Sequence, residues 1–322
     1  MTARRPGARV GLVLGDPAGV GAELAAKLLA GLAPDELVHV TVIGDARQLE
    51  AGARAAGLRL PAVELRDRGN ADPATIPLGR ACTEGGRAAL DNFRAALELA
   101  REGELGAVCF TPFNKQALHL AGMRHEDELR FAAEFLGWQR PVGEFNVLER
   151  LWNARVTSHV PLAQVAGLLS VARIVEAIAL TRATMSEAGF ARPRIAVAAL
   201  NPHAGEGGAF GREEIEIIGP AVVAAKQQGI DASGPYPADT VYVRAREGAF
   251  DAVLSMYHDQ GQIAIKLLGF AQGVTLLGGL PVPVTTPAHG TAYDIAGRGV
   301  ARDGALGHAF RLAAAMAARR RL

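Results

Sequence analysis

Three histidines in this chain each follow an apolar run and lie in a polar, turn-prone segment. His159 ends Arg-Val-Thr-Ser-His, His203 lies in Asn-Pro-His-Ala-Gly-Glu, and His258 lies in Tyr-His-Asp-Gln-Gly. If the strand ends that carry them converge, the three imidazoles form a site for a divalent metal. The alternative for each histidine is that it only satisfies the polar groups of its own turn. The three similar contexts together favour the metal site.

Further candidates for chemistry stand near these histidines. Asp259 is next to His258 and is a candidate partner of an imidazole or a base, and Asp239 is a second candidate for that role. Lys266 follows on a predicted helix as a candidate to donate or relay a proton, the alternative being a solvated surface lysine. Small residues fill the segment around His203, which is typical of a loop folded tightly around a ligand.

Short runs rich in Val, Ile and Leu alternate with longer Ala-rich amphipathic segments, and these elements must position the candidates. The alternation predicts mostly parallel sheets covered by helices. The polar segments fall where strands end and helices begin, the edge at which open α/β sheets bind ligands. The predicted strands are residues 10–14, 38–43, 107–110, 194–200 and 252–256, and the predicted helices are residues 20–32, 86–101, 126–136, 171–187, 213–228 and 305–317.

Composition narrows the function classes. With 322 residues, 49% of them hydrophobic and 21% charged, the chain is typical of a soluble globular protein with room for two domains. A formal net charge of +1 provides no field that would attract nucleic acid or a membrane. Residues 10–14 are too short for a secretion signal. Cys82 and Cys109 lack metal-ligand or redox spacing, so we expect a cytoplasmic protein.

The segment that begins at His289 is the strongest cofactor signal. His-Gly-Thr-Ala-Tyr-Asp-Ile-Ala-Gly resembles the loop His-Gly-Ser-Ala-Pro-Asp-Ile-Ala-Gly with which isopropylmalate and isocitrate dehydrogenases hold the adenosine of a nicotinamide cofactor. Those enzymes lack the Gly-x-Gly-x-x-Gly fingerprint, which is also missing from the Gly-rich turn at residues 15–23. The plainer alternative is a Gly-rich turn before the last helix. The resemblance implies that NAD, or alternatively NADP, contacts His289, Gly290, Thr291, Ala292 and Asp294.

Seven stretches, in order and nearly end to end, resemble the 4-hydroxythreonine-4-phosphate dehydrogenase family of the vitamin B6 pathway. They are residues 15–23, 111–115, 157–162, 200–214, 234–240, 257–270 and 289–299. The resemblance implies two α/β/α domains of the isopropylmalate/isocitrate dehydrogenase kind and a homodimer, with the active site in the interdomain cleft near the subunit interface. We expect residues 1–125 and 285–322 to form the first domain with the cofactor loop, and residues 126–284 to form the second with the metal site and dimer contacts.

The same resemblance implies a divalent metal held by His159, His203 and His258, with Lys266 contacting the substrate. Three neutral imidazoles suit zinc, cobalt or manganese better than magnesium, although oxygen ligands from substrate and water would let magnesium bind as well.

The substrate end departs from the family pattern. Members that bind a phosphorylated substrate carry Gly-His-Thr-Glu where this chain has Asp127-Glu128-Leu129-Arg130. Acidic side chains repel a phosphate dianion, although a nearby Arg or His offsets this if the loop folds differently, so a phosphorylated substrate stays an alternative. Thr275 replaces a family Asn and Val284 a family Arg. The predicted substrate-binding residues are Asp16, Asn114, Lys115, Glu128, Thr275 and Val284.

Together these features predict a metal-dependent, NAD-linked dehydrogenase that oxidises a secondary alcohol β to a carboxylate, followed by loss of carbon dioxide. The predicted substrate is an unphosphorylated small hydroxy acid such as a cis-diol carboxylate. Two alternatives are the authentic 4-hydroxythreonine-4-phosphate dehydrogenase and a dehydrogenase of a phosphorylated four-carbon sugar acid. From other classes, a phosphate acyltransferase-like transferase and a catalytically silent metal-binding dimer stay open.

Overall fold

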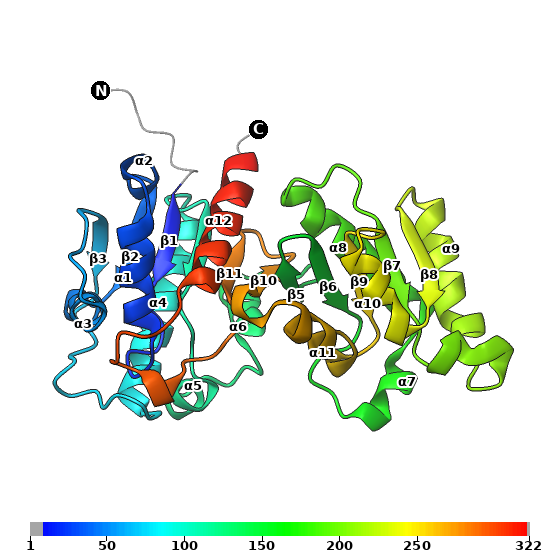
Figure 1. Ribbon diagram of the computed structural model, residues 1–322, viewed down its shortest axis with the longest axis horizontal. Helices are drawn as coiled ribbons and strands as arrows, with labels where there is room; N and C mark the ends of the chain where they lie inside the picture. The colour runs from blue at the N-terminus through cyan, green and yellow to red at the C-terminus, as the bar shows by residue number, and fades with distance from the viewer. Residues whose placement is uncertain (1–8, 321–322) are drawn as a thin grey trace. The chain divides into compact units, whose positions relative to one another are not determined.

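The computed structural model describes residues 9–320 and divides them into two compact units (Figure 1). The first unit holds residues 9–139, 274–276 and 280–320, and the second holds residues 140–273 and 277–279. This division places residues 126–139 and 280–284, together with residues 274–276, in the first unit, whereas from the sequence we expected them in the second. The first of these segments forms α6 (Glu128–Phe135), whose Phe131 ring lies 5.8 Å from that of Phe93 in α4. The second leads into a strand that pairs with β4 of the first unit.

The first unit contains parallel strands in the order β3-β2-β1-β4-β11. Helix α1 contacts both α3 and α12, and α12 packs on β1, β4 and β11. Helix α4 packs on β1, β2 and β4 and contacts α5 and α6. The bounds are β1 Val10–Val13, α1 Gly21–Gly31, α2 Pro34–Leu37, β2 Val40–Gly44, α3 Ala46–Ala56, β3 Glu64–Asp67, α4 Thr83–Arg101, β4 Ala107–Phe110, α5 Lys115–Leu120, β11 Val284–Pro287 and α12 Gly304–Arg319. β10 (Val274–Gly278) is divided between the two units.

The second unit begins with an antiparallel hairpin, β5-β6, and continues with parallel strands in the order β6-β9-β7-β8. α8 packs on β6, β7 and β9 and contacts α9, whereas α10 and α11 contact β7, β9 and the hairpin. The bounds are β5 Gly143–Leu148, β6 Leu151–Arg155, α7 Val165–Leu168, α8 Val171–Glu187, β7 Ile195–Ala198, α9 Gly219–Gln227, β8 Ala232–Tyr236, α10 Ala238–Arg246, β9 Ala252–Ser255 and α11 His258–Gly269.

The prediction of a mostly parallel α/β protein is confirmed. Every residue of β1, β2, β4, β7 and β9 is buried, and their mostly apolar sequences are what identified them as strands. Within the described residues, no single helix is long and apolar enough to cross a membrane, and only the bent pair formed by residues 162–168 and 171–187 passes that test jointly.

Candidate functional site

Two of the three predicted metal ligands lie side by side in the second unit. His159 follows β6 and His258 follows β9, and these strands are parallel neighbours, so their carboxyl ends bring both imidazoles to one edge. The centroids of the two rings are 5.7 Å apart. Nδ1 of His258 lies 2.6 Å from Oδ1 of Asp259, as expected for a partner of the imidazole. This contact favours the tautomer that carries the ring hydrogen on Nδ1, which makes Nε2 the candidate ligand atom.

His203, the third predicted ligand, follows β7, the other neighbour of β9. It lies in the turn Pro202–Gly208, in which residues 203–207 all have positive φ, from 43° to 79°. Non-glycine residues rarely adopt this conformation, and runs of it concentrate at functional sites. Among the described residues, the three imidazoles do not place one ligand atom each within 4.8 Å of one another. The structure thus brings His159 and His258 together, and metal binding by all three histidines stays a prediction.

One buried carboxylate holds the His203 turn. Glu214, which is 4% exposed, accepts hydrogen bonds from the backbone N–H groups of Leu200 and Asn201, both at 2.8 Å, and from Nδ2 of Asn201 at 3.0 Å. Burial favours a higher pKa for Glu214, but the hydrogen bonds from Asn201 and the backbone outweigh it and lower the pKa. Gly205 passes so close that a Cβ there would lie 2.7 Å from Oε2 of Glu214. Glu214 also opens a π-helical turn, a feature common at functional sites.

Replacing Glu214 by alanine is expected to destabilise the protein by about 2 to 5 kcal/mol, because it leaves buried donors without an acceptor. The urea dependence of the unfolding free energy measures this. The matched control is Glu216→Ala, which removes an exposed carboxylate of the same π-helical turn that pairs with Arg212. That variant is expected to lose less than about 0.5 kcal/mol. Equal losses in the two variants would contradict the assigned role of Glu214.

In the first unit, the predicted cofactor residues follow β11 in one loop. Nδ1 of His289 lies 3.0 Å from the carbonyl oxygen of Gly290. Nε2 of His289 is buried and has no hydrogen-bond partner among residues 9–320. A side chain added at Gly290 would meet nothing within 4 Å. Asp294 is exposed in the short turn Tyr293–Ile295. The buried, unpartnered Nε2 of His289 and the open surroundings of Gly290 fit a loop that binds a cofactor.

Asp16, a predicted substrate-binding residue, is only 1% exposed. Its Oδ1 accepts from the backbone N–H of Ala18 at 2.9 Å, and its Oδ2 accepts from the hydroxyl of Tyr293. Burial raises the pKa of the Asp16 carboxyl, and the hydrogen bonds from Tyr293 and Ala18 offset this only in part. Within the first unit, Asp16 therefore ties the cofactor loop to the turn after β1, and contact with a substrate stays a prediction.

The raised pKa of Asp16 implies that the stability of the fold depends on pH. Since the folded pKa lies above the usual value of 3.8, the stability linked to this group is present below pH 3.8 and is lost as the pH rises through the folded pKa. Asp16→Asn cannot ionise, so its unfolding midpoint should gain on that of the native protein as the pH is raised from 4 to 8. Thermal unfolding across this range, with the exposed Asp35→Asn as control, measures the difference. Parallel curves for the native protein and Asp16→Asn would refute it.

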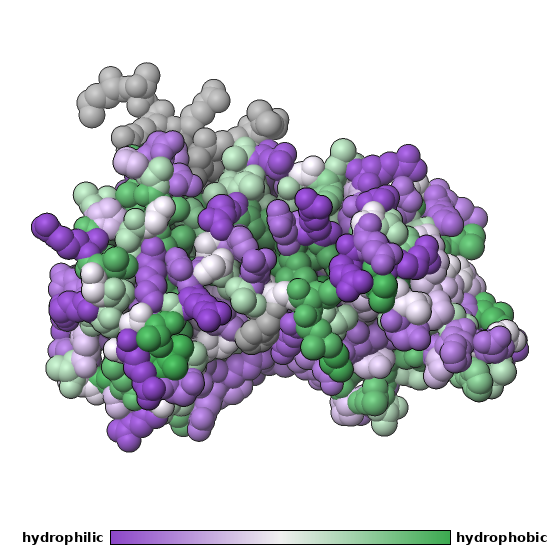
Figure 2. All heavy atoms as spheres, in the orientation of Figure 1, coloured by the Kyte–Doolittle hydropathy of each residue, from purple (hydrophilic) through white to green (hydrophobic). Residues whose placement is uncertain are grey.

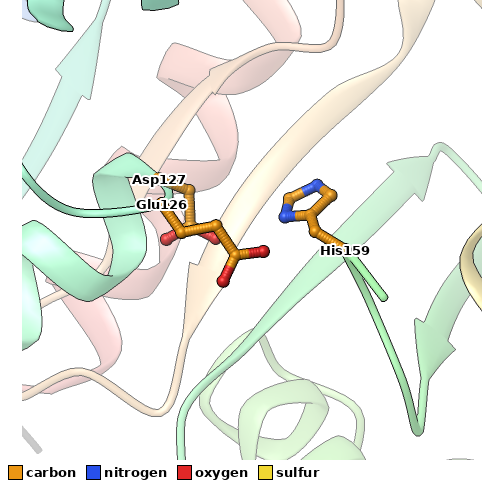
Figure 3. A group of neighbouring side chains, drawn as sticks. All are labelled: Glu126, Asp127 and His159. Carbon is orange, nitrogen blue, oxygen red and sulfur yellow. The ribbon is translucent and has the colours of Figure 1, made fainter. Parts of the chain in front are cut away.

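The start of α6 holds the residues that stand in place of Gly-His-Thr-Glu of the family that the sequence resembles. Figure 3 labels Glu126 and Asp127 at this helix start, and His159 after β6 in the other unit. Asp127 is 6% exposed, and its Oδ1 accepts from the backbone N–H of Arg130 at 2.8 Å. It is thus the N-cap of α6, with Glu126 and Glu128 on either side. The backbone donor at this helix start is bound to the chain's own carboxylate.

The other predicted residues are placed as follows. Val284 has no exposed surface and pairs in register with Val108 of β4, so its apolar side chain belongs to the core of the first unit, and its contact with a substrate stays a prediction. Asn114 caps α5, its Oδ1 accepting from Ala117 at 2.9 Å. The remaining four are Lys115, exposed on α5; Thr275, half-buried in β10; Asp239, exposed in the first turn of α10; and Lys266, exposed on α11.

Sequence reasoning missed Glu214 and Tyr293. Glu214 stands at the end of the small-residue segment that drew attention to His203, and an acidic residue that begins the next helix is a detectable signal for a loop-holding role. Tyr293 differs from the Pro of the quoted dehydrogenase loop, but the sequence could not show that its hydroxyl reaches Asp16, 277 residues away.

Comparison with known proteins agrees with these observations. Residues 36–313 match the family described as pyridoxal phosphate biosynthetic protein PdxA. The chain is 52% identical to a Rhizobium meliloti (strain 1021) protein named "Putative 4-hydroxythreonine-4-phosphate dehydrogenase 2", over 99% of this chain and 95% of that protein. It is 36% identical to the D-threonate 4-phosphate dehydrogenase of Salmonella typhimurium, over 96% and 98%.

Solved structures show the same relationship. A 4-hydroxythreonine-4-phosphate dehydrogenase from Klebsiella pneumoniae superposes with a TM-score of 0.82 at 34% identity, covering 96% of this chain and 99% of the other. A terephthalate 1,2-cis-dihydrodiol dehydrogenase from Burkholderia xenovorans LB400 superposes with a TM-score of 0.68 at 29% identity, covering 95% and 97%.

Proposed function

The chain belongs to the PdxA family of pyridoxal phosphate biosynthetic proteins, and from this premise we propose that it is an NAD-dependent, divalent-metal-dependent dehydrogenase. The proposed reaction is oxidation of a secondary alcohol β to a carboxylate, followed by decarboxylation. The observation that carries the proposal is the His159–His258 pair, with Asp259 on the second ring. The transferase alternative is set aside because the family's named relatives are dehydrogenases.

The donor set of the second unit fits a divalent metal. His159 and His258 supply two imidazoles from neighbouring strand ends, and the strained His203 turn supplies the proposed third. Neutral imidazoles favour zinc, cobalt or manganese, and magnesium would rely on oxygen ligands from substrate and water. Bound there, the metal would lower the pKa of the substrate hydroxyl, while NAD at the His289 loop would accept the hydride.

The chain's own residues perform the remaining steps. Asp259 orients the His258 ring through Nδ1, which keeps Nε2 directed at its ligand position. Lys266 follows on the same helix and is proposed to supply the proton that replaces carbon dioxide on the product. Asp239, in the first turn of α10, is the alternative base. His289, Gly290, Thr291, Ala292 and Asp294 are proposed to hold the adenosine end of the cofactor.

For the substrate, we propose an unphosphorylated hydroxy acid such as a cis-diol carboxylate. The support is the helix start of α6, where Asp127 occupies a backbone donor that would otherwise serve an anion, and where Glu126 and Glu128 add negative charge. One relative's name, the terephthalate dihydrodiol dehydrogenase, specifies a substrate of this kind. A second candidate is a phosphorylated four-carbon acid, which the name of the D-threonate 4-phosphate dehydrogenase favours.

A substrate panel tests the function directly. The purified protein, supplied with NAD and manganese or zinc, would be assayed by NADH absorbance against diol carboxylates and hydroxy acids, each with and without a phosphate group. NADH formation with at least one β-hydroxy acid is expected, and carbon dioxide release in the same reaction would show the decarboxylation. Absence of NADH with the whole panel, with NADP equally inactive, would reject the proposal.

We further propose a homodimer with the site near the subunit interface, as the family resemblance implies. Figure 2 shows an apolar patch over α11, where Ile263 and Leu267 are 62% and 83% exposed. Apolar side chains exposed to this extent on one helix face favour burial against a partner, and Lys266 lies next to them in sequence.

Leu267→Glu is therefore expected to shift the protein from dimer to monomer in sedimentation velocity. The matched control is Val243→Glu, also on an exposed face of the second unit; a dimer that survives Leu267→Glu would exclude this face.

A further inference from the structure

A largely buried ion pair attaches the end of the cofactor loop to α1. The side chains of Glu23 and Lys27 are 3% and 20% exposed and lie 2.8 Å apart. The Glu23 carboxylate accepts from the backbone N–H of Ala301 at 2.8 Å and from that of Gly299 at 3.1 Å. The Lys27 ammonium donates to the carbonyl oxygens of the same two residues, at 3.0 Å for Gly299 and 2.6 Å for Ala301.

One charged pair therefore satisfies all four polar backbone groups of residues 299 and 301. The carboxylate takes both amide hydrogens, and the ammonium gives to both carbonyls. Such bonds are stronger than neutral ones because one partner of each is charged and the site is mostly shielded from water. Glu23 and Lys27 bind only backbone groups of residues 299 and 301, so they fix the path of the chain there independently of its side chains. Gly299 has φ of +73°, and a Cβ there would lie 2.3 Å from the carbonyl oxygen of Ala55.

The other end of the loop is fixed on the same helix start. The backbone N–H of Val20 donates to the carbonyl oxygen of Thr291 at 3.0 Å. Gly19 lies against Thr291 so closely that a Cβ would come within 2.8 Å of that residue's carbonyl oxygen. Tyr293 reaches Asp16, as described above. Residues 291–293 and 299–301 are thus both anchored on residues 16–27, and the exposed Asp294 and Arg298 lie between the anchors.

We infer that Glu23 and Lys27 are positioning residues for the nicotinamide cofactor, which hold the loop that begins at His289 in its binding conformation before the cofactor arrives. The inference rests on the proposed function, since it takes that loop as the cofactor site. A loop already held in place costs less free energy to order when a ligand binds. Loosening it should therefore weaken cofactor binding, while the chemistry at a saturated site continues.

The test combines hydrogen exchange with kinetics in the full-length protein. Glu23→Gln and Lys27→Met are the two variants, because the second remains informative if the first fails to fold. Glu50→Gln is the matched control, since Glu50 forms an exposed i,i+4 pair with Arg54 on the adjacent α3. Amide exchange is measured without cofactor, followed by KM for NAD, KM for substrate, and kcat.

In both variants, the amides of residues 299 and 301 are expected to exchange at least about tenfold faster, and KM for NAD is expected to rise about tenfold, which corresponds to 1.4 kcal/mol. KM for substrate and kcat should change less than about threefold, and the control should match the native protein. Unchanged exchange at both amides would overturn the attachment, and faster exchange with an unchanged KM for NAD would reduce the pair to a structural role. Absence of NAD reduction by the native protein would instead reject the proposed function, with exchange still deciding the attachment.

Discussion

Replacing His258 by alanine is expected to abolish binding of catalytically competent metal and to lower kcat at least about a hundredfold. The expected size follows because removal of a metal ligand should cost no less than loss of a residue that merely orients one, for which losses of 10- to 100-fold are typical. His258 is the sharpest choice, since its ring faces His159 and its Nδ1 is held by Asp259. Turnover and bound metal, the latter by elemental analysis after dialysis, are measured on the same sample.

His39→Ala is the matched control, because this histidine is exposed in the first unit, between α2 and β2. Its activity and metal content should equal those of the native protein. Asp259→Asn should fall between the two, since the ring then loses a charged partner but keeps its ligand atom. Full activity of His258→Ala in chelator-treated buffer would show that the imidazole pair is not the metal site.

The second large effect concerns the substrate. We expect 4-phosphohydroxy-L-threonine to be turned over with kcat/KM about a hundredfold below that of a family member that carries Gly-His-Thr-Glu, because two or three charge-assisted hydrogen bonds of roughly 1.5 to 3 kcal/mol each are missing. The structure indicates two substitutions that should recover part of the lost kcat/KM for the phosphorylated substrate. Asp127→Thr keeps an oxygen to cap α6 while it removes a charge, and Glu126→Gln removes another.

Glu134→Gln on the same helix is the control, since it makes the same change of charge at a side chain that is 77% exposed. Arginine at position 284 is not a suitable addition, because Val284 is fully buried and an unpaired charge there would unfold the first unit. Efficient turnover of the phosphorylated substrate by the native protein would refute the specificity proposal and leave the metal and cofactor assignments standing.

Some strands of the fold could be predicted from the sequence and others could not, depending on how their side chains are buried. Strands buried on both faces, such as β7 and β9, are continuously apolar and were predicted correctly. The β5-β6 hairpin was missed because polar residues interrupt it. Within the second unit, Arg155 forms an ion pair with Glu144 and donates a hydrogen bond to Asn146 at 2.9 Å. The hairpin therefore includes polar side chains that are paired with one another, which an apolar pattern does not detect.

The candidate site, like the fold, could be predicted only in part. Histidines at strand ends could be located from the pattern, and the contact between His159 and His258 follows from the pairing of β6 with β9. The role of Glu23 could not be predicted, since it binds backbone groups of a segment that is distant in the sequence. The position of Glu214 at the start of a helix was a detectable signal that the sequence-based prediction did not use. From the sequence, the charge of Asp127 was considered only as a repulsion of a substrate phosphate. In the structure, this carboxylate also caps the start of α6.

We propose that this protein oxidises a hydroxy acid with NAD and a divalent metal bound through its histidines. The most direct test of this proposal is NADH formation by chelator-treated protein, with the best substrate of the panel, before and after manganese or zinc is added back. We expect negligible NADH formation without metal and recovery on addition of about one equivalent of metal per chain, with no recovery in His258→Ala. NADH formation at the full rate in the metal-free protein would contradict the proposal.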